Sequence, residues 1–151
     1  MKKAFTLVEL LIVVSILGIL AAVVVPEFGN HIQQAKESAA KDNLRILRNA
    51  IDHYALDNND VPPGYKDNDP SGSLRAPKFI SQLTTDGHYL SEIPENPFNN
   101  ASLVTMVEND ADFPESPVST DLYGWMYKPY TKEIRLNWSG TDSQGKAYFE
   151  Y

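Results

Sequence analysis

The chain has 151 residues, enough for about one domain, and a formal net charge of -7 at pH 7. An acidic surface repels phosphate backbones, so a nucleic acid is not expected as a partner. The sequence contains no cysteine, which excludes disulfide bonds, thiol catalysis and cysteine metal sites.

A long apolar segment lies near the start of the chain. Within residues 5–25 the only charged residue is Glu9, and a helix of this length spans about 30 Å, the thickness of a bilayer core. Two lysines precede the segment, and acidic residues predominate after it. The positive-inside tendency therefore predicts a single-pass helix with its amino terminus in the cytoplasm and the rest of the chain across the membrane.

Three interpretations of this apolar segment compete: a secretory signal peptide, a plain membrane anchor, and a helix in which Glu9 has a function. A secretory signal peptide needs a small-x-small cleavage site, which residues 21–26 do not contain. A plain membrane anchor fits the length but leaves Glu9 unexplained, since a charge at the centre of a spanning helix costs about 2.5–3.5 kcal/mol. A carboxylate kept there indicates a functional group with a positive or hydrogen-bonding partner. The bland alternative is a glutamate that the helix dipole stabilises and lipid headgroups solvate.

The stretch AFTLVE, which begins at Ala4, together with the apolar run, Gly18 and Pro26, closely resembles the amino terminus of type IV pilins and type II secretion pseudopilins. The resemblance implies that a prepilin peptidase removes residues 1–4 as a leader by cutting between Ala4 and Phe5. It also implies that the new amino group of Phe5 is methylated. Members of the family usually have glycine before the cut, and the alanine here departs from that pattern.

The resemblance also implies a partner for Glu9. In a filament, the Glu9 carboxylate of an incoming subunit meets the ammonium group of Phe5 in a neighbour that is already assembled. A pairing in such dry surroundings selects one axial register. Residues 5–25 then form a transmembrane helix before assembly and the filament core afterwards.

Two positions are expected to weaken this helix. Pro26 removes one backbone hydrogen bond and crowds the preceding turn, so a kink or local unwinding is predicted at residues 22–26. Gly18 is the weakest helix former of the apolar run and is the second predicted soft point. The alternative for Gly18 is close packing against a neighbouring helix.

Residues 26–58 have the amphipathic pattern of a soluble helix, which is predicted to end near residues 57–60. Residues 59–120 are predicted as a variable region of helix, strand and loop, with a short helix at residues 79–83 and a strand at residues 103–107. The predicted inner stripe of the amphipathic helix consists of Ile32, Ala35, Ala39, Ile46, Leu47, Ala50, Ile51 and Tyr54.

Residues 121–151 are predicted to form an antiparallel sheet followed by a loop. Strands at residues 123–127 and 133–138 flank a turn, and one face of this hairpin is apolar. Burying that face on the amphipathic helix predicts an α+β architecture. It is the pilin fold that the resemblance implies, in which the carboxyl half of a long amino-terminal helix packs against a small antiparallel sheet.

No catalytic constellation is evident in the sequence. His31, His53 and His88 lie far apart, and none of the nucleophile, phosphate-loop or metalloprotease motifs is present. The chain is therefore not expected to be an enzyme.

Residues 137–145 place oxygen-bearing side chains and two glycines directly after a strand. This composition loosely resembles the calcium-binding loop of major pseudopilins, and it implies Ser139 and Asp142 as calcium ligands. A turn built from glycine and aspartate without any metal is the alternative.

The resemblance implies a structural filament subunit, most like the major pseudopilin of a type II secretion system that drives protein export. Residues 49–63 and 89–98 resemble segments of major pseudopilins, and type IV pilins commonly carry the disulfide that is absent here. The implied partners are further copies of the chain in a helical homopolymer, prepilin peptidase, an assembly ATPase with its platform protein, a secretin and minor pilins or pseudopilins. The implied location is the bacterial inner membrane with the carboxyl-terminal domain in the periplasm, then a periplasmic pseudopilus or an extracellular pilus.

Three other functions stay open at this point. A type IV pilin would form a surface fibre for adhesion or motility. A membrane-anchored periplasmic binding module would keep its leader uncut and tolerate replacement of Glu9. A competence-type pilin that binds DNA would need a basic patch, for which Lys128, Lys132 and Arg135 are the candidates.

Overall fold

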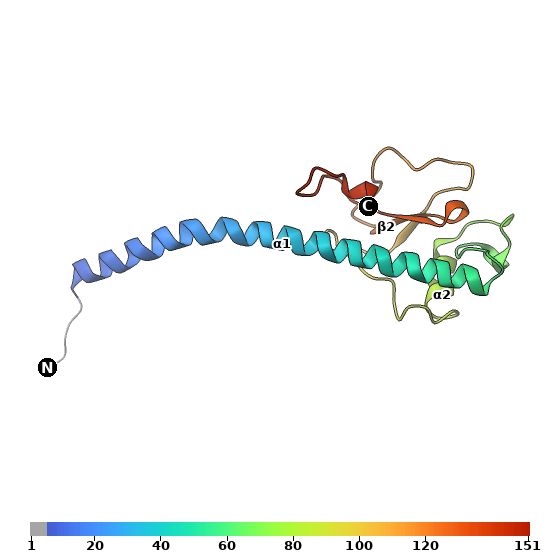
Figure 1. Ribbon diagram of the computed structural model, residues 1–151, viewed down its shortest axis with the longest axis horizontal. Coiled ribbons are helices and arrows are strands. Elements are labelled where there is room, and N and C mark those ends of the chain that lie inside the picture. Colours follow the sequence, from blue (N-terminus) through green and yellow to red (C-terminus); the bar gives the residue numbers. More distant parts are fainter. Residues whose placement is uncertain (1–5) are drawn as a thin grey trace. The chain divides into compact units, whose positions relative to one another are not determined.

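The computed structural model describes residues 6–151, with the side chains of residues 23–30 left out of the description. The predicted leader at residues 1–4, the cut between Ala4 and Phe5, and the methylation of Phe5 therefore lie outside the described residues. The helices are α1 (Leu7–Asp57) and α2 (Ala76–Leu83), the strands are β1 (Val104–Met106), β2 (Trp125–Lys128) and β3 (Glu133–Leu136), and short 3-10 turns occur at Lys66–Asn68, Pro129–Thr131 and Tyr148–Glu150 (Figure 1).

The chain divides into two compact units, Met1–Ala35 and Lys36–Tyr151. In the first unit, the large apolar side chains of α1 between Leu7 and Leu20 are 48% to 80% exposed. Among the described residues, no helix combines the length and the apolar character needed to cross a membrane. The predicted span, residues 5–25, extends beyond the described side chains at both ends.

The backbone of α1 is helical from Leu7 to Asp57, including Gly18 and Pro26. The described backbone is thus not unwound at either position. The side chain of Pro26 lies outside the description, and a kink at either residue stays a prediction.

In the second unit, α1 turns one face toward the core. Ala40, Leu44, Leu47, Ile51 and Tyr54 are at most 4% exposed, and their alternating spacing of four and three residues keeps them on one side of the helix. Figure 1 shows β2 beside this part of α1.

The predicted stripe was therefore correct only in its second half. Leu47, Ala50, Ile51 and Tyr54 are buried as predicted, and Ala39 is half-buried, whereas Ile32 (59% exposed), Ala35 and Ile46 (42% exposed) face outward. The prediction used only the positions of apolar residues in the sequence. The face of α1 that is buried depends on where the sheet packs on the helix. Within the second unit, burial begins at Lys36 and Glu37.

The sheet has three strands in the order β1-β2-β3. Strands β2 and β3 form the predicted antiparallel hairpin, with Trp125 opposite Leu136, and Lys132 closes the turn in a left-handed conformation (φ 56°). Strand β1 pairs with β2 in parallel, with Val104 opposite Trp125. The prediction of a purely antiparallel sheet was wrong for this pair, and the sheet is mixed.

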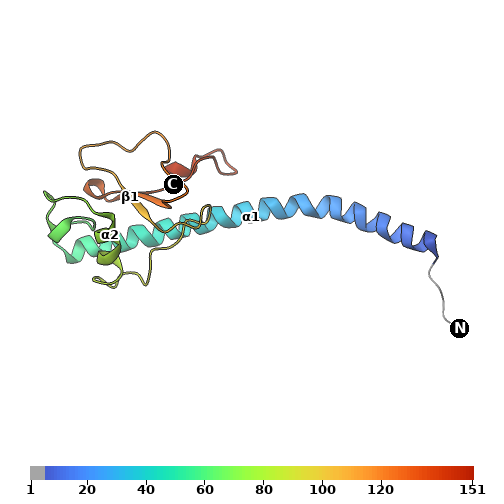
Figure 2. The same ribbon diagram turned by 180° about the vertical axis from the view of Figure 1, so that it is seen from behind.

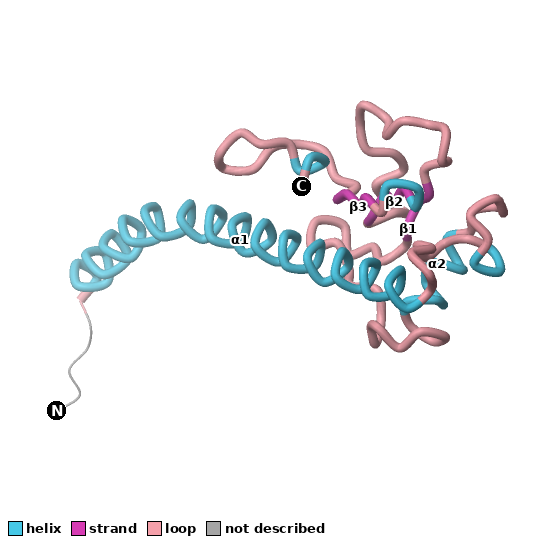
Figure 3. The backbone as a smooth tube through the Cα atoms, turned by 45° about the vertical axis from the view of Figure 1, so that its right-hand side comes forward, coloured by secondary structure: helices cyan, strands magenta, loops and turns pink. Residues whose placement is uncertain are grey.

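The long connection between β1 and β2 makes the parallel pairing possible. Residues 107–124 give the chain enough length to return to the same end of the sheet before β2 begins. The fully buried amide of Asn137 fixes this connection, since its Nδ2 donates to the carbonyl oxygens of Val118 (2.7 Å) and Tyr123 (2.8 Å). Loops make up much of this unit, as the tube in Figure 3 shows.

The core lies on both sides of the central strand β2, all four of whose residues are buried. One cluster joins Trp125 and Tyr127 to Phe79 and Leu83 of α2 and to the buried face of α1. A smaller cluster on the opposite side joins Met126 to buried apolar residues outside the helices. Figure 2 shows α2 and β1 near the carboxyl half of α1 from behind. The predicted α+β architecture is confirmed.

Candidate functional site

The first turn of α1 contains a reciprocal cap between Thr6 and Glu9. The Thr6 amide donates to Glu9 Oε2 (2.8 Å), the Thr6 hydroxyl donates to the same oxygen (2.7 Å), and the Glu9 amide donates to the Thr6 hydroxyl oxygen (3.2 Å). Threonine at the N-cap with glutamate three residues later is the capping box, which satisfies amides that have no partner within the helix. Glu9 therefore helps to begin α1 in the free subunit.

The sequence interpretation found Glu9 but missed Thr6. The signal was present, because a Thr-x-x-Glu spacing ahead of an apolar run indicates a helix start. The predicted Phe5 partner of Glu9 lies outside the described residues.

Apolar side chains on both sides of Glu9 in the sequence surround the helix. A helix that is apolar all round is stable only in apolar surroundings, which a lipid bilayer or neighbouring helices supply. The exposed large apolar residues of this part are Leu7, Val8, Leu10, Leu11, Ile12, Val13, Val14, Ile16, Leu17, Ile19 and Leu20.

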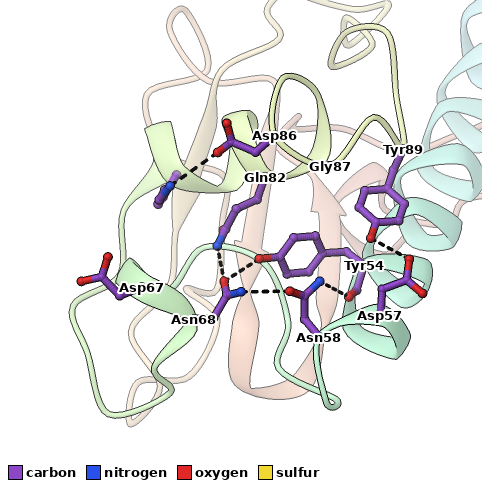
Figure 4. A pocket seen from close by; sticks show the side chains of 10 residues that line it. Tyr54, Asp57, Asn58, Asp67, Asn68, Gln82, Asp86, Gly87 and Tyr89 are labelled. Carbon is purple, nitrogen blue, oxygen red and sulfur yellow. Dashed lines mark hydrogen bonds and ion pairs between the residues drawn. The ribbon is translucent and has the colours of Figure 1, made fainter.

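A polar pocket of about 580 Å³ lies at the carboxyl end of α1 (Figure 4). Asn68 stands at its centre and accepts hydrogen bonds at Oδ1 from the Tyr54 hydroxyl (2.5 Å) and from Gln82 Nε2 (2.6 Å). Asn68 Nδ2 donates to Asn58 Oδ1 (2.9 Å), and the Tyr89 hydroxyl donates to Asp57 Oδ2 (2.7 Å). The lining residues thus use one another as partners and tie the loop after α1 to α2.

The pocket does not provide a metal centre. Its carboxylates come from Asp57, Asp67 and Asp86, and Asp86 is paired with Lys78 (3.5 Å). Across the described residues, no group of three or more histidine, aspartate or glutamate side chains is placed to hold a metal ion. The three histidines are exposed.

In the loop predicted to bind calcium, the two proposed ligands differ in exposure. Ser139 is exposed, whereas Asp142 is 7% exposed and turns inward. The Asp142 carboxylate accepts three hydrogen bonds, from the amides of Gln144 (2.9 Å) and Lys146 (2.9 Å) and from the Tyr151 hydroxyl (2.7 Å). These donors hold the pKa of Asp142 below its usual value, the Tyr151 hydroxyl most strongly.

Two family models match the chain. The prokaryotic N-terminal methylation motif matches residues 1–25, and the model of type II secretion system protein G matches residues 27–113. The second match covers more than half of the chain. This chain belongs to the type II secretion system protein G family. The cap, the apolar helix and the α+β domain are thus features of a pseudopilin.

Relatives of this pseudopilin include secretion-system and fimbrial proteins. Type II secretion system core protein G of Aeromonas hydrophila is 33% identical over 99 residues, which are 66% of this chain and 69% of that protein. The core protein G of Pseudomonas aeruginosa is 38% identical over 104 residues, 66% of this chain and 70% of that protein. The type IV major fimbrial protein FimA of Dichelobacter nodosus is 29% identical over 147 residues, 92% of this chain and 86% of that protein. No solved structure matches the chain significantly.

The family gives the protein a structural role. Its members are major pseudopilins of the type II secretion system, and the two matches together imply a membrane-anchored subunit of a periplasmic pseudopilus. The family is a structural one, in agreement with the expectation that the chain is not an enzyme.

Proposed function

We propose that this pseudopilin is the major subunit of its filament and that it polymerises from the inner membrane through α1. The observation that carries the proposal is the apolar surface from Leu7 to Leu20, exposed on all sides, with the carboxylate of Glu9 near its start. Such a surface is too large to remain in water. Lipid covers it before assembly, and the helices of neighbouring subunits cover it afterwards.

Glu9 sets the register of assembly in this proposal. Prepilin peptidase cuts after Ala4, and the methylated ammonium group of Phe5 becomes the positive partner of Glu9 in an adjacent subunit. Inside an apolar helix bundle, an unpaired carboxylate is costly and a paired one is specific. Each subunit therefore stops at the axial position where the two charges meet.

We propose the remaining machinery by analogy with the secretion system that gives the family its name. A cytoplasmic assembly ATPase, acting through a platform protein, adds subunits at the membrane, and minor pseudopilins and an outer-membrane secretin complete the system. The domain from Lys36 to Tyr151 lies in the periplasm. The acidic surface of the chain argues against nucleic acid as a partner.

The test uses two substitutions that separate charge from capping. Glu9→Gln removes the charge but keeps an acceptor for the Thr6 amide, since glutamine also completes a capping box. Thr6→Ala removes the hydroxyl from the cap and keeps the charge. We expect filament yield to fall at least about tenfold in Glu9→Gln, because the Phe5 ammonium group loses its carboxylate partner, and to persist in Thr6→Ala. Filament yield is measured beside amino-terminal sequencing and intact mass.

The native chain and both variants should begin at methylated Phe5. An intact Met1 terminus, together with indifference to Glu9→Gln, would contradict the proposal and indicate a plain membrane-anchored binding module. Loss of filaments in Thr6→Ala with normal filaments in Glu9→Gln would assign Glu9 to helix capping instead of subunit pairing.

A second candidate is a surface pilus. It is favoured by the fimbrial relative, whose match extends over 92% of this chain. Deletion of the gene distinguishes the two functions. A pseudopilin mutant retains exported proteins in the periplasm, whereas a pilin mutant loses sheared surface fibres, adhesion or motility.

A further inference from the structure

The loop from Ser139 to Lys146 is closed by its own backbone and by Asp142. The Asp142 amide donates to the Lys146 carbonyl oxygen (2.8 Å), and the Gly145 amide donates to the Asp142 carbonyl oxygen (3.0 Å). Asp142 Oδ1 accepts the amides of Gln144 and Lys146 from within the loop, each at 2.9 Å. This oxygen is therefore occupied by the loop itself.

The second carboxylate oxygen ties the loop to Tyr151. Asp142 Oδ2 accepts the Tyr151 hydroxyl at 2.7 Å, and the ammonium group of Lys41 on α1 lies 3.7 Å away. The Lys41 and Lys146 ammonium nitrogens lie 4.6 Å and 5.5 Å from the centre of the Tyr151 ring. A hydrogen bond to a charged group and two cation–π contacts hold this ring in place.

Tyr151 is fixed to α1 as well. Arg48 donates to the main-chain oxygen of Tyr151 and, at 3.2 Å, to the carbonyl oxygen of Ile134 in β3. Tyr151 is 9% exposed. The hydroxyl of Tyr148, another aromatic residue near it, donates to the buried carboxylate of Glu37 at 2.8 Å. We call the contacts among Asp142, Tyr151, Lys41 and Arg48 the tyrosine latch.

The residues of this loop do not fit calcium. Calcium takes six to eight oxygen ligands, usually from more than one carboxylate. Here the single carboxylate accepts three hydrogen bonds and has the Lys41 ammonium beside it. The exposed Ser139 contributes no second acidic group, and the described residues contain no cluster of three metal-binding side chains.

We propose that the tyrosine latch closes this loop by itself and that the domain folds without a divalent cation. The Lys41 ammonium supplies the positive charge beside Asp142 that a bound cation would supply. If the protein forms filaments as proposed above, assembly is insensitive to calcium chelators. That consequence rests on the proposed function, whereas the latch can be tested on the subunit alone.

The test is thermal unfolding of the purified full-length chain in detergent, followed by near-ultraviolet circular dichroism, with excess EGTA or with about 1 mM calcium. We expect the two midpoints for the native sequence to agree within about 1 °C. A calcium site with a dissociation constant 100-fold below the calcium concentration would raise the midpoint by roughly 5–10 °C. A rise of that size would overturn the proposal.

Two tyrosine substitutions provide the matched comparison. Tyr151→Phe removes only the hydroxyl of the latch, and we expect its midpoint to fall by several degrees, with no recovery in calcium. Tyr130→Phe removes a hydroxyl from a side chain that is 73% exposed and should leave the midpoint unchanged. A Tyr151→Phe chain as stable as the native sequence, or one that calcium stabilises, would also overturn the proposal.

Discussion

At the scale of single residues, the hydroxyl of Tyr127 is unusual. It is buried at the centre of the domain and has no hydrogen-bond partner within the described chain. Its ring packs against Phe79, with 4.6 Å between the ring centres. Burial raises the pKa of Tyr127 above its ordinary value, because an ionised phenolate would lose its hydration there.

Alkaline pH is therefore expected to destabilise the domain. The unfolded tyrosine ionises near pH 10, whereas folded Tyr127 keeps its proton, so the unfolded state binds fewer protons above that pH. The free energy of unfolding should be constant with respect to this group below about pH 10 and should fall as the pH rises further. Urea unfolding of the native sequence and of Tyr127→Phe at about pH 8 and pH 11 measures the effect.

Tyr127→Phe should be as stable as the native sequence at about pH 8, or more stable by about 1 kcal/mol, because it removes an unpartnered buried hydroxyl. Its loss of stability at high pH should be smaller. Tyr130→Phe serves as the control, since Tyr130 is exposed. Equal alkaline losses in all three chains would show that Tyr127 does not titrate as described.

At the scale of elements, the carboxyl half of α1 carries the core. Leu47 is 0% exposed and Leu56 is 77% exposed, although both lie on the same helix. Leu47→Ala should lower the free energy of unfolding by about 2–5 kcal/mol, because it removes buried methyl groups and leaves a cavity. Leu56→Ala should change it by less than about 0.5 kcal/mol. Urea unfolding distinguishes the two, and similar losses would mean that the buried face of α1 is assigned incorrectly.

Much of this element structure was predictable because it depends on local pattern. The end of α1 at Asp57 follows from poor helix formers, and the β2–β3 hairpin follows from alternating apolar residues. The helix within residues 76–83 and the strand at Val104–Met106 were also predicted. The parallel pairing of β1 was not, since a three-residue strand carries too little pattern to give its direction.

Some residues of the candidate site could be predicted from the sequence, and others could not. Glu9 could be found from the sequence alone, because it is a charged residue inside an apolar run. Thr6 could have been found from its spacing of three residues from Glu9. Asp142 was selected from its loop composition, but its partners Lys41 and Tyr151 lie on other elements. Their meeting depends on tertiary packing, which no local pattern encodes.

At the scale of the whole molecule, the two units have different requirements. The unit Lys36–Tyr151 has its own core, whereas the described part of the unit Met1–Ala35 exposes apolar side chains. A fragment of residues 31–151 should therefore be a soluble monomer in size-exclusion chromatography without detergent. Its thermal midpoint should lie within a few degrees of that of the full chain in detergent, because the core is retained. An aggregated fragment, or one without cooperative unfolding, would contradict this division.

The long-range contacts of α1 also impose an order on folding. Glu37 and Arg48 find their partners in Tyr148 and Tyr151, which are 111 and 103 residues further along the chain. The ribosome makes the helix first, and its inner face is completely covered only after β2, β3 and residues 148–151 have been translated. During that interval the uncovered apolar stripe is open to proteases and to aggregation. The nascent chain therefore stays vulnerable until residues 148–151 have been made and have packed on α1.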